Sequence, residues 1–235
     1  MATPYLLDLP NSGKSRDAAH RLWQPERLRR FLNIAVALIG IILTLPLWVV
    51  IAVLVRATSP GPIFYRQTRV GIDRRGLGPE PAGGYRRNDL GGRPFTIYKF
   101  RTMSVASDDA PQQWAQPGDA RVTPLGRVLR KLRLDELPQL INVLRGEMNV
   151  VGPRPEQPAI FASLRNEIGE YPVRQRVLPG ITGWAQVNWG YDQTLEDVRK
   201  KLSYDLEYLE RRSVTEDARI MLMTVPVMLG RRGSL

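Results

Sequence analysis

Two adjacent acidic residues, Asp135 and Glu136, are candidate catalytic residues of this sequence. Basic residues surround them in the sequence: Arg130, Lys131, Arg133, Arg145 and Arg154. A carboxylate that nearby cations keep ionised can act as a nucleophile. A neighbouring carboxylate can hold Mg²⁺, a hard cation that prefers oxygen ligands. The pair is therefore a candidate catalytic site, with Asp135 as the nucleophile and Glu136 as the metal ligand.

The same pair also fits the start of a helix. An apolar face at helical spacing follows it and ends before a glycine: Leu137, Leu140, Ile141, Leu144 and Gly146. Asp135 would then be the N-cap, where the helix dipole stabilises a carboxylate. The N3 position would be Pro138, which has no N–H to donate, so the carboxylate stays partly uncommitted. On the dipeptide alone, a structural cap is the stronger interpretation.

The composition limits which chemistry is available. The chain has 235 residues, with 34 Lys and Arg against 23 Asp and Glu, and a formal net charge of +11. Such a charge favours an anionic partner such as phosphorylated ligands, acidic lipids or nucleic acid. The absence of cysteine excludes disulfides and thiolate sites, and one histidine, His20, argues against a histidine triad or a histidine-rich metal site. Catalysis must use carboxylates, Lys, Arg, Tyr or hydroxyls.

An uncharged apolar segment, Phe31–Val55, follows a polar tail over residues 1–30. A helix of this length could cross a bilayer at about 1.5 Å per residue. Pro46 near its middle should kink or break the helix. Both flanks are basic, which favours two cytoplasmic ends and hence a re-entrant turn at Pro46. The residues alone weigh this evenly against a kinked span, and a buried soluble helix is a poor third.

The remaining chain predicts a small hairpin and several helices. Residues 63–65 and 95–98 are rich in strand formers and should pair. Alternation places Lys99 and Arg101, just after the second strand, on one face, as solvated residues or as phosphate ligands. Asp73–Arg93 should form a long loop. Amphipathic or charged helices are expected in the later chain: after the Thr123-Pro124 cap, over 157–170, over 195–212, and over 216–229 with an interruption at Pro226.

Together these residues resemble the small monotopic phosphoglycosyl transferases, the bacterial sugar transferases that act on polyprenyl phosphate. The segments that carry the resemblance run in family order over residues 31–229: Ser59-Pro60-Gly61-Pro62-Ile63-Phe64 with Arg69-Val70-Gly71, Tyr98-Lys99-Phe100-Arg101-Thr102-Met103, Leu134-Asp135-Glu136-Leu137-Pro138-Gln139, Val151-Gly152-Pro153-Arg154-Pro155, and PGITGWAQ at 179–186. Any one segment is weak evidence, whereas their order is specific.

The resemblance implies transfer of a sugar-1-phosphate from a UDP-sugar to undecaprenyl phosphate, with release of UMP, as the first membrane step of surface glycan assembly. It implies that Asp135 is the nucleophile of a ping-pong mechanism and that Glu136 engages Mg²⁺. Conserved cationic positions of the family, expected to hold phosphates, match these residues: Lys99, Arg101, Arg154 and Arg174. Asp217 matches a recurrent acidic position whose role the resemblance does not fix.

The resemblance also implies an α+β protein, mostly α. An N-terminal re-entrant helix over 31–56, interfacial amphipathic helices and the hairpin would surround a compact catalytic domain over 57–235. The protein would be monotopic on the cytoplasmic face of the bacterial inner membrane, in contact with its lipids. The chain lacks the multi-span N-terminal region of larger members and looks like the minimal form. A homodimer is left open.

Two departures and two alternatives accompany this interpretation. The family often has Ser-Pro at the bend, where this chain has Leu45-Pro46; Thr44 is expected to bond a carbonyl that Pro46 frees. The loop Asp73–Arg93 is longer than usual. A non-catalytic basic membrane anchor is the main alternative. A nucleic-acid binder would fit the charge, but the apolar Phe31–Val55 segment and the lack of a reader motif argue against nucleic acid.

Overall fold

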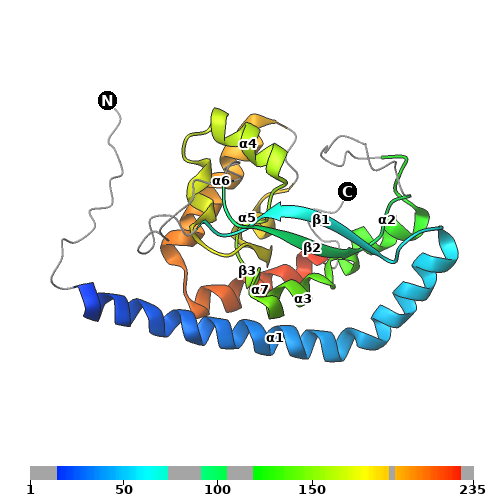
Figure 1. Ribbon diagram of the computed structural model, residues 1–235, viewed down its shortest axis with the longest axis horizontal. Coiled ribbons are helices and arrows are strands. Elements are labelled where there is room, and N and C mark those ends of the chain that lie inside the picture. Colours follow the sequence, from blue (N-terminus) through cyan, green and yellow to red (C-terminus); the bar gives the residue numbers. More distant parts are fainter. Residues whose placement is uncertain (1–14, 74–90, 105–118, 191–193, 229–235) are drawn as a thin grey trace, which may run out of the picture.

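A single long helix, α1 (Ser15–Thr58), runs along one side of the molecule and curves around it (Figure 1). The computed structural model describes residues 15–73, 91–104, 119–190 and 194–228. The other helices in this part of the chain are α2 (Pro124–Lys131), η1 (Leu134–Glu136), α3 (Gln139–Arg145), α4 (Pro158–Glu167), η2 (Tyr171–Arg176), α5 (Trp184–Asn188), α6 (Leu195–Arg211) and α7 (Val214–Met228). The strands are β1 (Phe64–Val70), β2 (Pro94–Phe100), β3 (Asn149–Val151) and β4 (Gly180–Thr182).

Helix α1 differs from its prediction at both its start and its middle. It begins at Ser15, so part of the predicted polar tail is helical, while residues 1–14 lie outside the described residues. It continues through Pro46, so the predicted break is wrong and the helix only curves (Figure 1). The hydroxyl of Thr44 donates to the carbonyl oxygen of Gly40 at 2.6 Å, whereas the carbonyl that Pro46 frees, four residues back, is that of Ile42. The predicted bond to the freed carbonyl is therefore wrong.

One face of α1 packs on the rest of the protein between Arg29 and Val55. The contacting residues recur at helical spacing: Arg29, Asn33, Ala37, Ile41, Trp48, Ile51 and Val55. The opposite face exposes large apolar side chains, with Ile42 68% and Leu43 75% exposed. By length and composition, Glu26–Thr58 could cross a membrane. A re-entrant course stays a prediction, since the structure contains no bilayer.

The predicted hairpin is confirmed: β1 and β2 pair antiparallel, with Tyr65 opposite Lys99. Most of the loop between them, residues 74–90, lies outside the described residues. A second sheet was not predicted. It consists of two short parallel strands, β3 and β4, far apart in the sequence. Three-residue strands carry too little periodicity to be predicted from the sequence.

Later helices match their expected positions closely. Thr123 caps α2, accepting a bond from the backbone N–H of Gly126 at 2.9 Å, and Pro124 follows it as predicted. Helices α4 and α6 lie where the sequence placed them. Helix α7 continues through Pro226, so the predicted interruption there is wrong. Whether α2 and α7 lie at a membrane interface stays a prediction.

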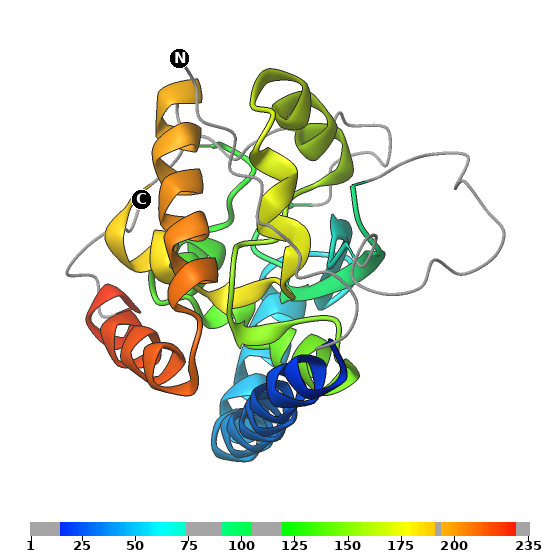
Figure 2. The ribbon, with the colours of Figure 1, turned by 90° about the vertical axis from the view of Figure 1, so that its left-hand side faces the viewer.

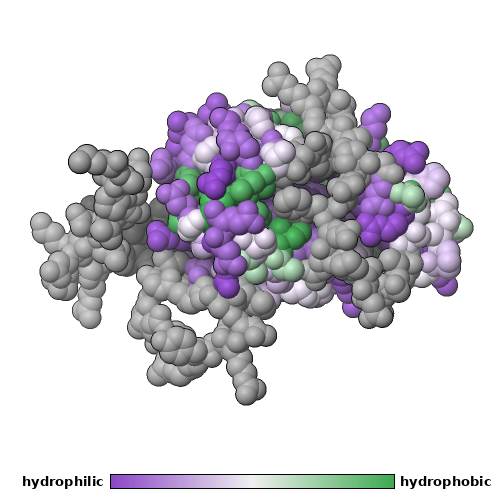
Figure 3. Space-filling view, turned by 90° about the horizontal axis from the view of Figure 1, so that it is seen from above, coloured by the Kyte–Doolittle hydropathy of each residue, from purple (hydrophilic) through white to green (hydrophobic). Residues whose placement is uncertain are grey.

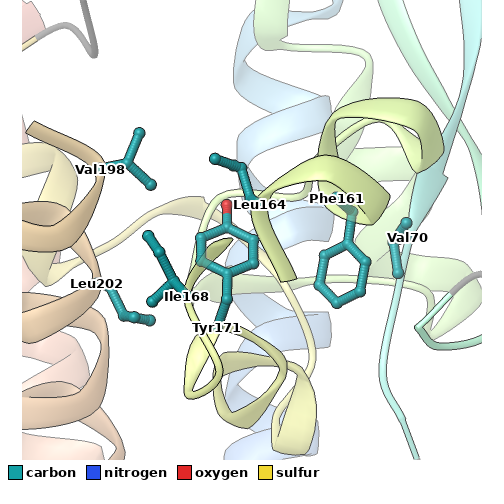
Figure 4. Packing of buried hydrophobic residues seen from close by; sticks show 7 residues of the cluster. All are labelled: Val70, Phe161, Leu164, Ile168, Tyr171, Val198 and Leu202. Carbon is teal, nitrogen blue, oxygen red and sulfur yellow. The ribbon is translucent and has the colours of Figure 1, made fainter. Parts of the chain in front are cut away.

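Helices α4 and α6 cover the side of the domain that faces away from α1 (Figure 2). Between α4, α6 and β1 lies an apolar cluster in which the Phe161 and Tyr171 rings pack 5.5 Å apart (Figure 4). The face opposite α1 is mostly hydrophilic where the described residues are visible (Figure 3). Apolar exposure is therefore concentrated on α1, and the catalytic candidates lie in the domain that α1 supports.

Candidate active site

The acid pair lies in a tight turn before α3 rather than at a helix cap. Asp135 and Glu136 belong to the 3-10 turn η1, and Pro138 is the residue that precedes α3. The prediction that Asp135 is an N-cap is therefore wrong, although Gly146 does end α3, in the left-handed conformation at φ 76°. Arg133 enters the turn with φ 57°, an uncommon conformation for a non-glycine residue. This turn buries both acids, each only 6% exposed.

Glu136 is the centre of a charged cluster. Its Oε1 atom accepts hydrogen bonds from the Lys99 Nζ atom at 2.7 Å and from the Arg154 Nη2 atom at 2.8 Å. Lys99 comes from β2, and Arg154 from the loop after β3. Three segments distant in sequence thus meet at one carboxylate oxygen, and the structure brings together four of the predicted site residues: Lys99, Asp135, Glu136 and Arg154.

Asp135 is held more loosely than its neighbour. The Lys99 Nζ atom lies 3.9 Å from the Asp135 Oδ2 atom, beyond hydrogen-bonding distance. Lys99 therefore attracts the Asp135 carboxylate electrostatically but donates its hydrogen bond to Glu136. This arrangement suits a division of roles in which Glu136 is fixed and Asp135 keeps lone pairs for reaction.

The two acids differ in acidity because their partners differ. Burial raises the pKa of Asp135 above its usual value, and Lys99 offsets only part of this effect. Burial would also raise the pKa of Glu136, but Arg154 and Lys99 outweigh it and hold that pKa well below its usual value. Burial lowers the pKa of Lys99 despite the opposing charge of Glu136. Glu136 is thus the firmly ionised acid of the pair.

The donor set of the pair is compatible with Mg²⁺. This cation usually takes one or two protein carboxylates, and waters and substrate phosphates complete its shell. Both hydrogen bonds to Glu136 noted above reach Oε1, so its Oε2 atom and the Asp135 carboxylate are the oxygen ligands to consider. Among the described residues, no group of three or more acidic, histidine or cysteine side chains could form a complete protein-only site.

Arg101 lies elsewhere and supports the end of α1. Its Nη1 atom donates to the carbonyl oxygen of Pro60 at 2.5 Å, and its Nη2 atom donates to that of Ser59 at 2.7 Å. It is 6% exposed. These contacts connect the residues that follow α1 to the end of β2. The phosphate role of Arg101 stays a prediction, and in this structure its Nη1 and Nη2 atoms are engaged with backbone carbonyls.

Arg174 and Asp217 each lie in a buried ion pair. Arg174 pairs with Asp205 of α6 at 2.7 Å. Asp217 of α7 pairs with Arg29 of α1 at 2.8 Å and accepts a hydrogen bond from the Tyr208 hydroxyl. The Arg29–Asp217 pair therefore attaches α1, just before its apolar segment, to α7. Asp217 has a structural partner that its sequence position did not reveal.

Sequence reasoning also missed Asn142, which attaches β2 to α3. Its side chain accepts a bond from the backbone N–H of Tyr98 at 3.2 Å and donates to the carbonyl of Thr96 at 2.7 Å. These bonds cover the edge of β2 beside Lys99. The available signal was a polar residue between apolar neighbours in the predicted helix, and this residue is fully buried.

Comparison with known proteins gives a consistent result. A family model described as bacterial sugar transferase matches residues 24–231. The chain is 42% identical over 202 residues to the UDP-N-acetylgalactosamine-undecaprenyl-phosphate N-acetylgalactosaminephosphotransferase of Aeromonas hydrophila, covering 86% of this chain and 44% of the relative. It is 40% identical over 222 residues to the UDP-glucose:undecaprenyl-phosphate glucose-1-phosphate transferase of Escherichia coli, covering 94% of this chain and 42% of the relative.

A third relative is matched over more of its own length. The UDP-glucose:undecaprenyl-phosphate glucose-1-phosphate transferase of Caulobacter vibrioides is 40% identical over 203 residues, which are 86% of this chain and 69% of that protein. The chain spans less than half the length of the first two relatives. The matched region includes the acid pair and every segment that contributes to its cluster.

Proposed function

The chain belongs to the bacterial sugar transferase family, and on that premise we propose that it transfers a sugar-1-phosphate from a UDP-sugar to undecaprenyl phosphate, or a similar polyprenyl phosphate. UMP is the second product. The reaction begins assembly of a surface glycan. The observation that carries the proposal is the position of Asp135 beside the Lys99–Glu136–Arg154 cluster.

In the first step, a carboxylate oxygen of Asp135 attacks the phosphorus that bears the sugar. A bond forms between this oxygen and phosphorus, the bridging P–O bond of the diphosphate breaks, and its electron pair leaves with UMP. No proton needs to move, so a site without histidine or cysteine can perform the step. Lys99 and Arg154 supply positive charge where the phosphates would lie, which is what phosphoryl transfer demands.

In the second step, a phosphate oxygen of the polyprenyl phosphate attacks the same phosphorus. The bond to Asp135 breaks, the carboxylate is restored, and the polyprenyl diphosphate sugar leaves. Glu136 would hold Mg²⁺ together with the substrate phosphates. A metal ion held there would neutralise part of the charge on the transferring phosphoryl group. Glu136 suits this role because Arg154 and Lys99 keep it ionised.

We place the protein on the cytoplasmic face of the inner membrane as a monotopic protein. Support comes from α1, whose apolar segment is held to the same domain on both sides: Arg29, just before it, pairs with Asp217, and Val55, at its end, packs with Phe100. A straight span would separate those two contacts across the bilayer. The exposed apolar face of α1 would lie toward lipid. Tags at the two termini should both be accessible only from the cytoplasm, and a periplasmic N-terminus would overturn this topology without affecting the chemistry.

The chemistry is tested with the purified chain in detergent or nanodiscs. A panel of UDP-sugars labelled in the sugar phosphate is incubated with Mg²⁺, first without acceptor and then with polyprenyl phosphate. We expect stoichiometric UMP release and a labelled protein in the first case, and continuous UMP release in the second. The label should be absent from Asp135→Asn. Normal turnover by that variant would exclude Asp135 as the nucleophile.

The same assay separates a transferase from a basic membrane anchor. If the protein is an anchor, wild type, Asp135→Asn and Glu136→Gln should all bind anionic vesicles equally well. None of the three should release UMP from any donor. A transferase loses UMP release in the variants while vesicle binding is retained. Vesicles of neutral and anionic lipid should therefore be tested alongside the activity assay.

A further inference from the structure

The loop that carries Arg154 is held by its backbone carbonyls. Consecutive carbonyl oxygens each accept a hydrogen bond from a different part of the protein: Pro153 from the N–H of Gly180 at 2.9 Å, Arg154 from the Nη2 atom of Arg174 at 3.0 Å, Pro155 from the Nη1 atom of Arg69 at 3.1 Å, and Glu156 from the N–H of Val70 at 2.9 Å. Two of these residues are prolines, which have no N–H. Acceptance by carbonyls is therefore the main way to fix this loop.

Arg174 is engaged at all of its N–H groups. A guanidinium has five N–H donors. Its Nε and Nη2 atoms both contact the Oδ2 atom of Asp205, at 2.8 and 2.7 Å. Its Nη1 atom donates to the Tyr171 hydroxyl at 2.7 Å and lies 3.5 Å from the Oε1 atom of Glu156, and its remaining Nη2 donor reaches the Arg154 carbonyl. Its side chain is only 2% exposed.

A phosphate could contact Arg174 only if one of these buried bonds were broken. Leaving a buried carboxylate such as Asp205, 2% exposed, without its partner is costly. The geometry thus argues that Arg174 acts through the protein. The side chain of Arg154, in contrast, is 31% exposed and donates to Glu136, so it is the arginine that can meet a substrate.

We propose that Arg174 and Asp205 are positioning residues, which fix the backbone of Arg154 and thereby aim its guanidinium at Glu136 and the donor phosphates. Asp205 orients Arg174 through two contacts, Arg174 holds the Arg154 carbonyl, and Arg154 contacts Glu136 2.8 Å away. Helix α6 therefore contributes to the active site without touching the substrate. The part concerning the donor phosphates rests on the proposed function; the part concerning the loop does not.

The first test is hydrogen exchange of the segment around Arg154, which requires no activity. Asp205→Asn is chosen because it keeps the shape of the side chain but removes its charge. We expect faster exchange of the Gly152, Val70 and Gly180 amides in the purified full chain, because their N–H groups belong to this segment or donate to its carbonyls. Glu207→Gln is the matched control on the same helix, where Glu207 accepts a bond from Trp184 and pairs with Arg211. This control should leave the exchange of these three amides unchanged.

The second test is a double-mutant cycle on UMP release. If Asp205 acts through Arg154, Asp205→Asn should reduce the rate of UMP release by about 10-fold in the wild-type background. In the Arg154→Ala background it should reduce that rate by less than about 2-fold. Equal factors in both backgrounds, as for a direct phosphate ligand, would overturn the positioning role. So would unchanged exchange of the Gly152, Val70 and Gly180 amides in Asp205→Asn, or equal changes in Glu207→Gln.

The two tests keep this inference apart from the proposed function. If wild type releases no UMP from any UDP-sugar, the proposed function fails, while the exchange data still decide whether Asp205 and Arg174 hold the loop. If wild type is active and exchange is unchanged, the proposed function stands and the positioning role is wrong. Should Asp205→Asn unfold, Arg174→Lys provides the second variant, because lysine cannot reproduce the forked contacts.

Discussion

The Nζ atom of Lys99 lies 2.7 Å from the Oε1 atom of Glu136, which connects the β-hairpin to the turn that carries the acid pair. Arg154 donates to the same oxygen from a third segment. One carboxylate oxygen therefore joins elements that are separate in the sequence. The cluster is at once a feature of stability and the electrostatic environment of Asp135.

Glu136→Gln should destabilise the fold at neutral pH by about 2 kcal/mol, because Lys99 and Arg154 lose a charged acceptor. The folded-state pKa of Glu136 lies well below its unfolded value of 4.5, since Arg154 and Lys99 outweigh burial. Its contribution is therefore fully present above pH 4.5 and is lost as the pH falls through the folded-state pKa. Chemical denaturation of wild type and variant across this range should show the two stabilities converge in acid. A difference that persists unchanged in acid would contradict the assignment.

The acid limb of the pH–rate profile should report the ionisation of the Asp135 carboxyl group. Burial raises its pKa above 3.8, so its nucleophilic form is lost as the pH falls through that raised value. Lys99 lowers the Asp135 pKa, and therefore Lys99→Met should move the acid limb to higher pH as well as reduce the maximal rate. The measurement is the initial rate of protein labelling by a UDP-sugar without acceptor. An acid limb that stays in place or moves to lower pH would show that Asp135 does not control it.

Arg101→Met should act on stability rather than on donor binding. Removing its hydrogen bonds to the Ser59 and Pro60 carbonyls leaves those groups without a charged donor and should cost about 2 kcal/mol. The midpoint temperature of thermal unfolding should fall. The KM of the folded protein for the UDP-sugar should stay close to that of wild type. Lys99→Met provides the contrast, since its main effect should be on turnover. A large rise in KM for Arg101→Met at unchanged stability would instead support its predicted phosphate role.

Local sequence patterns predicted the parts of this fold that depend on local chemistry. The Thr123-Pro124 cap, the glycine that ends α3 and the pairing of the two strand segments all follow from short-range rules. The proximity of Asp135, Glu136, Lys99 and Arg154 followed from the family resemblance, because spacing in the sequence cannot bring a strand and two loops together.

What the sequence could not predict is mostly a matter of long-range partners. Nothing local distinguishes Arg174, whose donors are engaged inside the protein, from Arg154, which meets Glu136 with part of its side chain exposed. Asp205 and Asp217 lie on predicted helices, yet their partners come from elsewhere in the chain. The helix cap assigned to Asp135 failed because η1 and Pro138 separate the acid pair from α3.

A glycine in α2 allows this helix to lie against the end of β2. A Cβ atom added to Gly126 would lie 2.0 Å from the carbonyl oxygen of Thr102, a backbone atom that cannot turn aside. That same Thr102 carbonyl accepts a bond from the N–H of Thr123, and the Thr102 hydroxyl accepts one from the Nε atom of Arg130. Gly126→Ala must therefore separate α2 from the strand end, and the chain from α2 continues directly into η1.

Gly126→Ala is expected to destabilise the protein by about 3 kcal/mol, as overpacking against backbone does, and to reduce UMP release even below its unfolding temperature. Gly169→Ala is the matched control, since a Cβ atom there meets nothing within 4 Å. The control should be neutral or stabilising by about 0.5 kcal/mol, because alanine restricts the unfolded chain. Thermal unfolding and UMP release measured on both variants decide the point. Wild-type stability in Gly126→Ala would mean that α2 does not need its close approach to Thr102.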